Sequence, residues 1–398
     1  MTKRCYLNAV GLLCSAGDSP EMVKESLLNE RATLTMSSAF SADMETVLPL
    51  GLYQGELPQL TLADKKWQSR NNQFALAALM QINDEVQDAI AQFGAHRVGV
   101  IIGTSTSGTA ECETAIEQWV QTGNIPPEYD YGLQGMGATA QYVAEYLGVQ
   151  GPSYGVSTAC SSGAKALASA RRLIRAGVCD AVIAGGVDTL CKLTVQGFSS
   201  LDAVSDEICN PFSNNRKGIN VGEGAALFLM TSVDKGVELL GVGEDSDAYH
   251  LSAPDPTGAG AIRCMKAALN DANLIPEDIG YVNLHGTATK LNDQMESIAM
   301  HAVFGSDTLC SSTKPFVGHT LGAAGVVEAA ICYLTLESGM DDFVPVQLWD
   351  GVLDPELPKI NLVDSAEKLT SPLNYVLSNS FAFGGSNISL LFGRISND

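Results

Sequence analysis

The sequence is poor in basic residues and lacks the patterns that mark metal sites, redox pairs and membrane spans. It holds 23 lysines and arginines against 45 aspartates and glutamates, and this net charge of −22 argues against a nucleic-acid partner. Its ten cysteines form no CxxC pair and show no His/Cys ligand spacing, so we expect no metal site and no redox motif. No apolar run reaches the length of a membrane span, and the amino end lacks a signal-peptide cleavage site. Reduced thiols in such a chain indicate a cytoplasmic protein.

What is present is the composition of a globular enzyme. The chain has 398 residues, of which 45% are hydrophobic and 39 are glycine, enough for a large α/β domain or two fused ones. Strand and helix signals alternate, which predicts a layered α/β protein. In the first part we expect strands at residues 6–10, 97–102, 180–184 and 225–231, helices at 20–29, 71–93, 107–121, 134–147 and 160–176, and a surface loop at 32–60.

The order of elements begins again near residue 237. The joint that carries His319 corresponds in this order to the joint that carries Cys160. We therefore interpret residues 1–235 and 236–398 as two similarly built α/β halves, fused near residues 232–238. In the second half we expect a helix at 259–273 and strands at 237–242, 281–284, 309–313, 373–378 and 388–392.

The segment YGVSTACSSG at residues 154–163 leads from a short strand into an Ala-rich helix. Ser157 or Thr158 is a natural N-cap, which would place Cys160 in the first helical turn. Unpaired amides and the helix dipole would favour a thiolate there by about 1 kcal/mol, or roughly 0.7 of a pKa unit, and would offer an oxyanion site. Cysteine is also a common core residue, so position alone makes Cys160 only a candidate nucleophile.

Two of the five histidines, His285 and His319, each follow a predicted strand and stand beside glycine. Side chains at the carboxyl ends of parallel strands converge on one crevice, where open α/β sheets bind ligands. Together with Cys160 in the equivalent joint of the other half, they favour a catalytic site. The remaining histidines have polar or helical surroundings typical of surface or packing residues: His96, His250 and His301.

Four segments resemble, in this order, the motif set of the β-ketoacyl-[acyl-carrier-protein] synthases. They are STACSSG at 157–163, HGTAT at 285–289, Lys314 ahead of GHTLGAAG at 318–325, and NSFAFGGSN at 379–387. The resemblance covers most of the chain from about residue 97. It implies a thiolase-like fold, in which two related α/β halves form five layers, α-β-α-β-α, and which is usually dimeric.

The resemblance implies a decarboxylative condensation of the elongating, Cys-His-His type, in fatty acid or polyene/polyketide synthesis. Cys160 would carry the acyl chain, and neutral N–H groups of His285 and His319 would meet the enolate formed when a malonyl thioester loses carbon dioxide. Removing one such donor typically costs about 2.7–4 kcal/mol. Lys314 and Glu296 are expected to form an ion pair behind the histidines. Substrates would arrive on the phosphopantetheine of an acyl-carrier protein, and the enzyme would need no cofactor of its own.

Further roles follow from the same resemblance. Phe383 resembles the side chain that gates the acyl pocket, and its backbone N–H, with that of the nucleophile, would form the oxyanion hole. Phe381 and Gly384 flank it in a turn whose glycines allow close approach of the substrate. Thr287 and Thr289 are expected to hydrogen-bond the amides of the phosphopantetheine arm.

The chain departs from the common pattern in two places. After HGTAT many relatives continue with proline and then Gly-Asp, where this chain has KLND at 290–293. Ser213 and Lys217 stand where acidic residues are frequent. These departures leave the acyl specificity open. The Asn292-Asp293 pair and RNN at 70–72 resemble the synthases of aryl polyene gene clusters.

The expected partners are proteins. Carrier protein is acidic, so an acidic enzyme needs a local basic patch to bind it, and Lys65, Lys66 and Arg70 are the candidates. We expect a homodimer, or a heterodimer in which this chain is the active subunit beside a chain-length-factor-like paralogue.

Other members of the same fold are alternatives. A non-decarboxylating, thiolase-type acyltransferase needs a second cysteine in a C-terminal Cys-Gly motif, where this chain has FGG at 383–385. The two histidines disfavour an initiating synthase of the Cys-His-Asn type. Cys160 disfavours a chain-length factor, since such subunits typically lack the nucleophile.

Overall fold

The computed structural model describes residues 3–127, 129–337, 343–364, 369 and 373–394. Within them helices and strands alternate along the chain, beginning with β1 (Tyr6–Cys14), in which every residue is buried. The first helix, α1 (Pro20–Leu28), starts where the sequence predicts: Ser19 Oγ accepts a hydrogen bond from the N–H of Met22, and Pro20 fills the first helical position. In this part of the chain, no helix is both long and apolar enough to cross a membrane.

Two sets of five strands share one order. In the first set the order is β5-β4-β6-β7-β1, and in the second it is β10-β9-β12-β13-β8, with the same parallel and antiparallel pairings in both. The sets meet where β1 pairs with β8, and β11 (Asn361–Leu362) adds to the far edge beside β10. The first set comprises β1, β4 (Val98–Gly103), β5 (Ser153–Val156), β6 (Ala181–Asp188) and β7 (Gly224–Thr231). The second comprises β8 (Val237–Ser246), β9 (Tyr281–Asn283), β10 (Leu309–Ser311), β12 (Tyr375–Ala382) and β13 (Ser386–Arg394).

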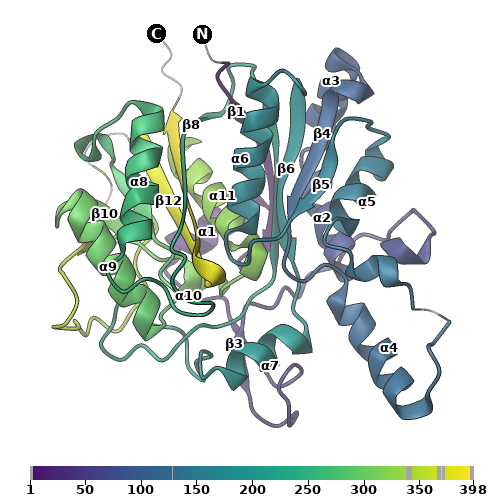
Figure 1. Ribbon diagram of the computed structural model, residues 1–398, viewed down its shortest axis with the longest axis horizontal. Coiled ribbons are helices and arrows are strands. Elements are labelled where there is room, and N and C mark those ends of the chain that lie inside the picture. The colour runs from purple at the N-terminus through teal and green to yellow at the C-terminus, as the bar shows by residue number, and fades with distance from the viewer. Residues whose placement is uncertain (1–2, 128, 338–342, 365–368, 370–372, 395–398) are drawn as a thin grey trace.

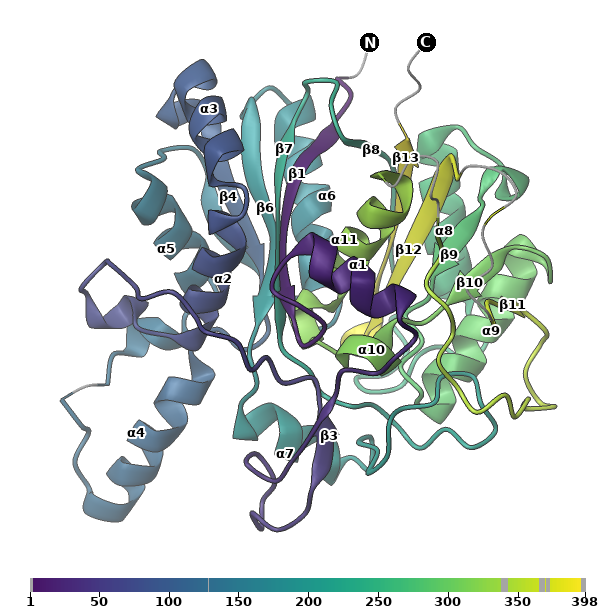
Figure 2. The same ribbon diagram turned by 180° about the vertical axis from the view of Figure 1, so that it is seen from behind.

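Helices fill the spaces on both sides of each strand set. Two helices, α6 (Ser162–Arg175) and α11 (Ala324–Glu337), pack against each other and against both sets in the middle of the molecule (Figure 1). The outer face of the first set is covered by α2 (Arg70–Met80), α3 (Asn83–Phe93) and α5 (Ala138–Leu147), and that of the second by α8 (Ala259–Ala272) and α9 (Lys290–Phe304). This is the five-layer α-β-α-β-α arrangement that the family resemblance implies. From behind, α1 lies beside α11 (Figure 2).

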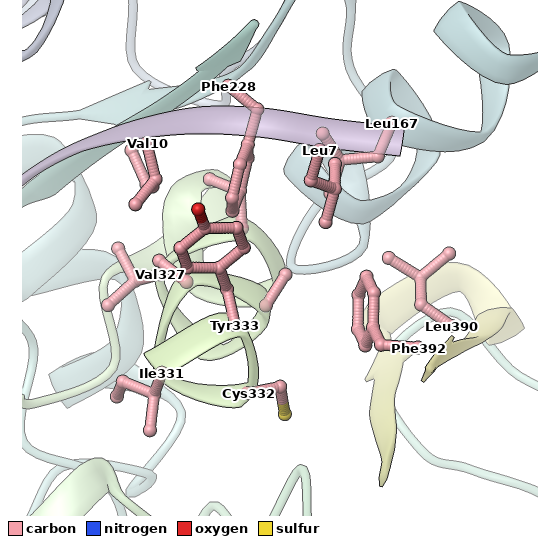
Figure 3. Close-up of a cluster of buried hydrophobic side chains, with 14 of the residues drawn as sticks. Leu7, Val10, Leu167, Phe228, Val327, Ile331, Cys332, Tyr333, Leu390 and Phe392 are labelled. Atoms are coloured by element: carbon pink, nitrogen blue, oxygen red, sulfur yellow. The ribbon is translucent and has the colours of Figure 1, made fainter. Parts of the chain in front are cut away.

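The centre of the protein is α11, whose residues are buried from Ala324 to Leu336. A helix that is apolar on all sides belongs in a core, because no face of it suits water. Side chains of β1, β7 and β13 pack around it, among them Leu7, Phe228 and Leu390 (Figure 3). The ring centroids of Phe228 and Tyr333 are 5.9 Å apart. The same layer holds α6, so the positions of both central helices are fixed by packing from two sides.

Some elements differ from the sequence-based expectation. The helix predicted at 71–93 is two helices, α2 and α3, because the backbone of Ile82 leaves the helical conformation, with a φ of −120° and a ψ of 19°. The side chain of the preceding Gln81 bonds the backbone N–H and C=O of Leu12 at 3.0 Å each. The expected loop at 32–60 contains two short paired strands, β2 (Thr35–Ser37) and β3 (Leu48–Leu50). The helices α4 (Thr109–Thr122), α7 (Lys192–Ser200) and α10 (Lys314–Val317) complete the set.

Candidate active site

Cys160 lies in a tight turn between β5 and α6. The predicted N-cap at residue 157 or 158 is wrong: α6 begins at Ser162 with Ser161 as its N-cap, so Cys160 precedes the helix by two residues. Ala159 has a φ of 51°, in the left-handed region, which reverses the chain there. Ser162 Oγ accepts from the N–H of Thr158 at 2.9 Å and donates to the carbonyl of Ala159 at 2.6 Å, which closes the turn.

The structure brings Cys160, His285 and His319 together. The sulfur and one ring nitrogen of each histidine all lie within 4.8 Å of one another. The two imidazole rings are nearly perpendicular, with their centroids 5.4 Å apart, and all three side chains are buried. They line a cavity of about 500 Å³. His285 follows β9, and His319 follows α10, so the site is assembled at strand-to-helix joints of both strand sets.

Hydrogen bonds fix the proton on each imidazole. Nδ1 of His319 accepts from the N–H of Leu321 at 3.2 Å, and Nδ1 of His285 faces the ammonium of Lys314 at 3.5 Å. Burial, together with the charge of Lys314, lowers the pKa of both histidines well below 6.5, so both rings are neutral at neutral pH. A neutral ring that accepts at Nδ1 carries its proton on Nε2. Both Nε2 atoms are therefore donors, which suits an oxyanion and disfavours a metal ion.

Lys314 is buried behind the histidines, but its ion-pair partner differs from the expected one. Its ammonium pairs with Glu328 of α11 and donates to the backbone carbonyl of His285. Glu296 instead accepts the N–H groups of His285 and Gly286 at 2.8 and 2.7 Å. The expected pair between Lys314 and Glu296 is therefore wrong, because the α11 carboxylate, not the α9 carboxylate, reaches the ammonium.

Burial also sets the state of the thiol. It raises the pKa of Cys160 to about 11, while the charge of Lys314 and the backbone N–H groups of Phe383 and Cys160 act in the opposite direction. The lowered pKa expected from the helix tip is wrong, since the residue is outside the helix and largely buried. At rest the sulfur carries its proton.

The segment that leads into the turn at 383–385 lines the cavity with Phe381, Ala382 and Phe383. Phe383 is 37% exposed, lines the cavity and packs on Phe198 of α7 with ring centroids 5.7 Å apart. Phe381 is buried and meets the ring of His285 edge-on at 6.3 Å. Gly384 has a φ of 81° and donates its N–H to the carbonyl of Leu251 at 2.7 Å. An L-residue other than glycine would be strained at this position.

The two threonines predicted to bind substrate also line the cavity. The hydroxyls of Thr287 and Thr289 are 2.9 Å apart, and Thr289 caps α9 by accepting the N–H of Asn292 at 3.4 Å. The hydroxyl of Thr287 accepts the N–H of Thr289 at 3.4 Å, so both hydroxyls have a structural partner already. Their contact with a substrate arm stays a prediction.

Sequence reasoning missed a buried carboxylate at the end of β6. Asp188 is 0% exposed and accepts from the hydroxyls of Thr104 and Thr106 at 2.6 and 2.8 Å, from the N–H of Ser105 at 2.8 Å, and from the N–H of Gly322 at 2.6 Å. It joins a turn after β4 to the chain just beyond His319. The sequence signal for this carboxylate was an aspartate at the end of an apolar strand. Acidic residues are rarely buried unless they have hydrogen-bonding partners, so its position indicated a structural role.

The three cations predicted to bind carrier protein lie in different surroundings. Arg70 forms a two-point ion pair with the buried Glu223, at 2.6 and 3.0 Å, and thus has an internal partner. Lys65 is exposed, and its Nζ donates to the carbonyl of Pro127 at 3.0 Å. Lys66 is partly exposed, and its Nζ lies 3.4 Å from a carboxylate oxygen of Asp64. The docking prediction therefore applies chiefly to the two lysines.

Comparison with known proteins identifies the family. A family model described as the β-ketoacyl synthase N-terminal domain matches residues 69–235, and one described as the C-terminal domain matches residues 237–343. The 3-oxoacyl-[acyl-carrier-protein] synthase 2 of Staphylococcus aureus (strain COL) is 31% identical over 98% of both sequences. The chain belongs to the β-ketoacyl synthase family.

Solved structures agree with this assignment. A chain from the complex of a ketosynthase (ApeO) with its chain length factor (ApeC) from Xenorhabdus doucetiae is 42% identical, with a TM-score of 0.94 over 99% of this chain and 98% of that one. The ishigamide ketosynthase/chain length factor is 26% identical, with a TM-score of 0.89 over the whole of both chains. The predicted family, thiolase-like fold, enzyme class and reaction class are confirmed.

Proposed function

We propose that Cys160 is the nucleophile of this β-ketoacyl synthase and that His285 and His319 stabilise the enolate of its second substrate. The observation that supports this most directly is the approach of the sulfur and two ring nitrogens to within 4.8 Å on the wall of one cavity. Each histidine presents a proton on Nε2, and neither is charged. Neutral, preorganised donors in a buried site suit developing negative charge.

Loading of the enzyme is a thiol exchange. The sulfur of Cys160 attacks the carbonyl of an acyl thioester, a new C–S bond forms, and the carrier thiol leaves with the proton that Cys160 gives up. The backbone N–H groups of Cys160 and Phe383 are the donors for the oxyanion. In the resting enzyme both N–H groups face the sulfur and lower the pKa of the thiol, against the effect of burial. Because the resting thiol has a pKa of about 11, proton transfer to the leaving thiolate accompanies the exchange.

Condensation breaks one C–C bond and forms another. The malonyl thioester loses carbon dioxide, and the negative charge left on its thioester oxygen meets the two Nε2–H donors. The resulting carbanion attacks the acyl carbon, and the Cys160 thiolate leaves and takes a proton from water. Lys314 supports this step by facing Nδ1 of His285, which keeps that ring neutral and its proton on Nε2.

We further propose that both acyl groups arrive on the phosphopantetheine of an acyl-carrier protein, with no metal or cofactor bound by the enzyme, and that Thr287 and Thr289 bind the arm. The likeness to a complex of a ketosynthase with its chain length factor favours a heterodimer with a paralogue of the same fold over a homodimer. It also favours a role in polyene synthesis of the aryl polyene type over fatty acid synthesis.

Two broader proposals follow. The repeated strand order supports two halves at 1–235 and 236–398, the first carrying the nucleophile and the second the histidines. All ten cysteines are free, which supports a reducing compartment, the cytoplasm.

Intact-protein mass spectrometry tests the proposed roles. The chain, alone and co-expressed with its paralogue, is incubated with a panel of acyl-carrier proteins, and malonyl-carrier protein is then added. We expect an acyl adduct in the wild type and none in Cys160→Ala. His285→Ala and His319→Ala should load but lose condensation by about a hundredfold or more. Loading of Cys160→Ala, or full condensation by either histidine variant, would refute the assignment.

A further inference from the structure

The cavity wall carries a cation that the proposed chemistry does not use. Lys290 lines the same cavity as Cys160 and His285, and its side chain is exposed. It directly follows Thr289, which caps α9, so it is the first residue of that helix. A positive charge is unfavourable at this end of a helix because the macrodipole is positive there. Helix stability therefore does not account for a lysine at this position.

Lys290 also differs from the other two cations on the cavity wall. Arg216 pairs with Asp354 at 2.6 Å, and Lys217 lies 3.0 Å from Glu207. For Lys290, no carboxylate of the described residues lies within 4.0 Å of Nζ. Arg216 sits under the same turn, with Nη2 3.5 Å from the carbonyl of Lys290, and its buried Nε has no hydrogen-bond partner among the described residues. The same lining also holds Asp202 and Asp247, but neither carboxylate lies within 4.0 Å of the Lys290 ammonium.

Along the segment that leads from the catalytic histidine to this lysine, residues 285–288 are buried and the last two residues are increasingly exposed. His285 is 1% exposed, Thr287 is 6% exposed, Thr289 is partly exposed, and Lys290 is exposed. The segment thus runs from the floor of the cavity to its mouth. Five residues reach at most about 17 Å, a span that an extended pantetheine arm also covers.

We propose that Lys290 binds the phosphodiester of the phosphopantetheine arm at the mouth of the cavity. The inference rests on the function proposed above, since it takes the thioester end of the arm to lie at Cys160. With that end on the buried floor and the amides beside Thr287 and Thr289, the anionic end reaches the exposed lysine. An ammonium and a phosphate form a charge-assisted hydrogen bond, and the free Nζ offers three donors for it.

Carrier-free thioesters test the assignment without the carrier's own acidic surface. An octanoyl group is presented either on phosphopantetheine or on pantetheine, which differ only in the phosphate, and the rate of acylation of Cys160 is followed by intact mass. The wild type should react about three- to fivefold faster with the phosphorylated thioester, as expected for one solvent-accessible ion pair. Lys290→Gln should bring this ratio close to one, and Lys290→Arg should keep it.

A matched control is available in α7. Lys192 is likewise an exposed lysine at the first position of a helix, but it does not line the cavity. Lys192→Gln should leave the phosphate preference unchanged. Raising the ionic strength from about 0.05 to 0.5 M should reduce the preference in the wild type and have no effect on Lys290→Gln.

The outcomes separate this inference from the function on which it rests. If Cys160 is acylated but the wild type shows no phosphate preference, or Lys290→Gln retains it, the phosphate assignment is wrong. If Lys290→Gln slows only the carrier-borne thioester and neither carrier-free one, the lysine contacts the carrier's surface and the assignment is again wrong. Absence of acylation with every thioester would instead count against the proposed function.

Discussion

The ammonium of Lys314 lies 3.5 Å from Nδ1 of His285, with Glu328 as its ion-pair partner. A buried cation in this position acts on the histidine in two ways. It occupies Nδ1, so the ring proton resides on Nε2, and its charge lowers the pKa of the ring. The ion pair thus determines that Nε2 of His285 is a hydrogen-bond donor toward the substrate, although the ion pair itself lies on the other side of the ring.

Replacing this lysine should affect decarboxylation more than loading. Lys314→Met alone leaves Glu328 buried without a partner, at a cost of about 3–5 kcal/mol of stability, so the double variant Lys314→Met/Glu328→Gln is compared as well. In the double variant the pKa of His285 should rise toward 6.5, and the rate of malonyl decarboxylation should fall about tenfold or more. When the pH is lowered, the double variant should lose its remaining decarboxylation at a higher pH than the wild type does. Acylation of Cys160 should persist. Equal loss of acylation and decarboxylation in the folded double variant would contradict this prediction. Lys266→Met, on the surface of α8, is the control and should change neither step.

Glu296 should give stability a distinctive pH dependence. Burial raises its pKa from 4.5 to about 7, so between these values the folded chain holds a proton that the unfolded chain releases. Stability from this group therefore falls as the pH rises from 4.5 to 7. Glu296→Gln should remove a slope worth on the order of 3 kcal/mol across that window. Urea unfolding at several pH values measures it, and the exposed Glu117→Gln should leave the slope intact.

The carboxylate of Asp188 should be essential for folding stability. Asp188→Asn turns one acceptor oxygen into a donor that faces N–H and O–H groups, including the N–H of Gly322. Leaving two such groups unsatisfied costs about 2–6 kcal/mol. The control is Asp180→Asn, which removes a partly exposed ion pair with Arg97 and should cost about 1 kcal/mol or less. Similar midpoints for the two variants in urea would show that the buried network contributes little.

The docking prediction can be tested by charge reversal. Lys65→Glu/Lys66→Glu should raise the KM for carrier-borne substrates about tenfold at low salt and leave the reaction of Cys160 with a small thiol reagent unchanged. Lys235→Glu/Lys266→Glu changes the net charge equally at other exposed positions and should leave the KM nearly constant. A matching rise in both double variants would mean that net charge, rather than a local patch, controls binding.

Much of the site was predictable because its chemically important residues lie in short motifs that follow strands. Cys160 follows β5, His285 follows β9, and His319 follows the short helix α10 that comes after β10, each in a short local motif. The repeated element order relates the two parts of the chain. The alternation of strands and helices likewise follows from periodicity and from the Ser19-Pro20 start of α1. The division at residue 235 stays a prediction.

Other features depend on contacts between distant segments, which periodicity does not encode. Glu328 reads as one residue of an apolar helix until α11 is packed beside α10, and only then does it meet Lys314. The break between α2 and α3 falls at Ile82, whose backbone is not helical, beside a Gln81 side chain that bonds the backbone of β1, 69 residues away. The thiol of Cys160 was expected at a helix tip, but Ala159 turns the chain before the helix begins.

The complete burial of α11 has a consequence for how such enzymes diversify. A helix with neighbours on every side accepts few replacements, because each one disturbs several layers at once. Among the described residues, the cavity lining holds no residue of α11; it includes Phe198, Leu201, Asp202, Ala203, Lys290 and Leu291, among them exposed positions that can vary singly. New substrate ranges in this family should therefore arise by substitutions at the exposed positions of the cavity lining. The residues of α11, including Glu328 of the ion pair, should stay the same from one enzyme to the next.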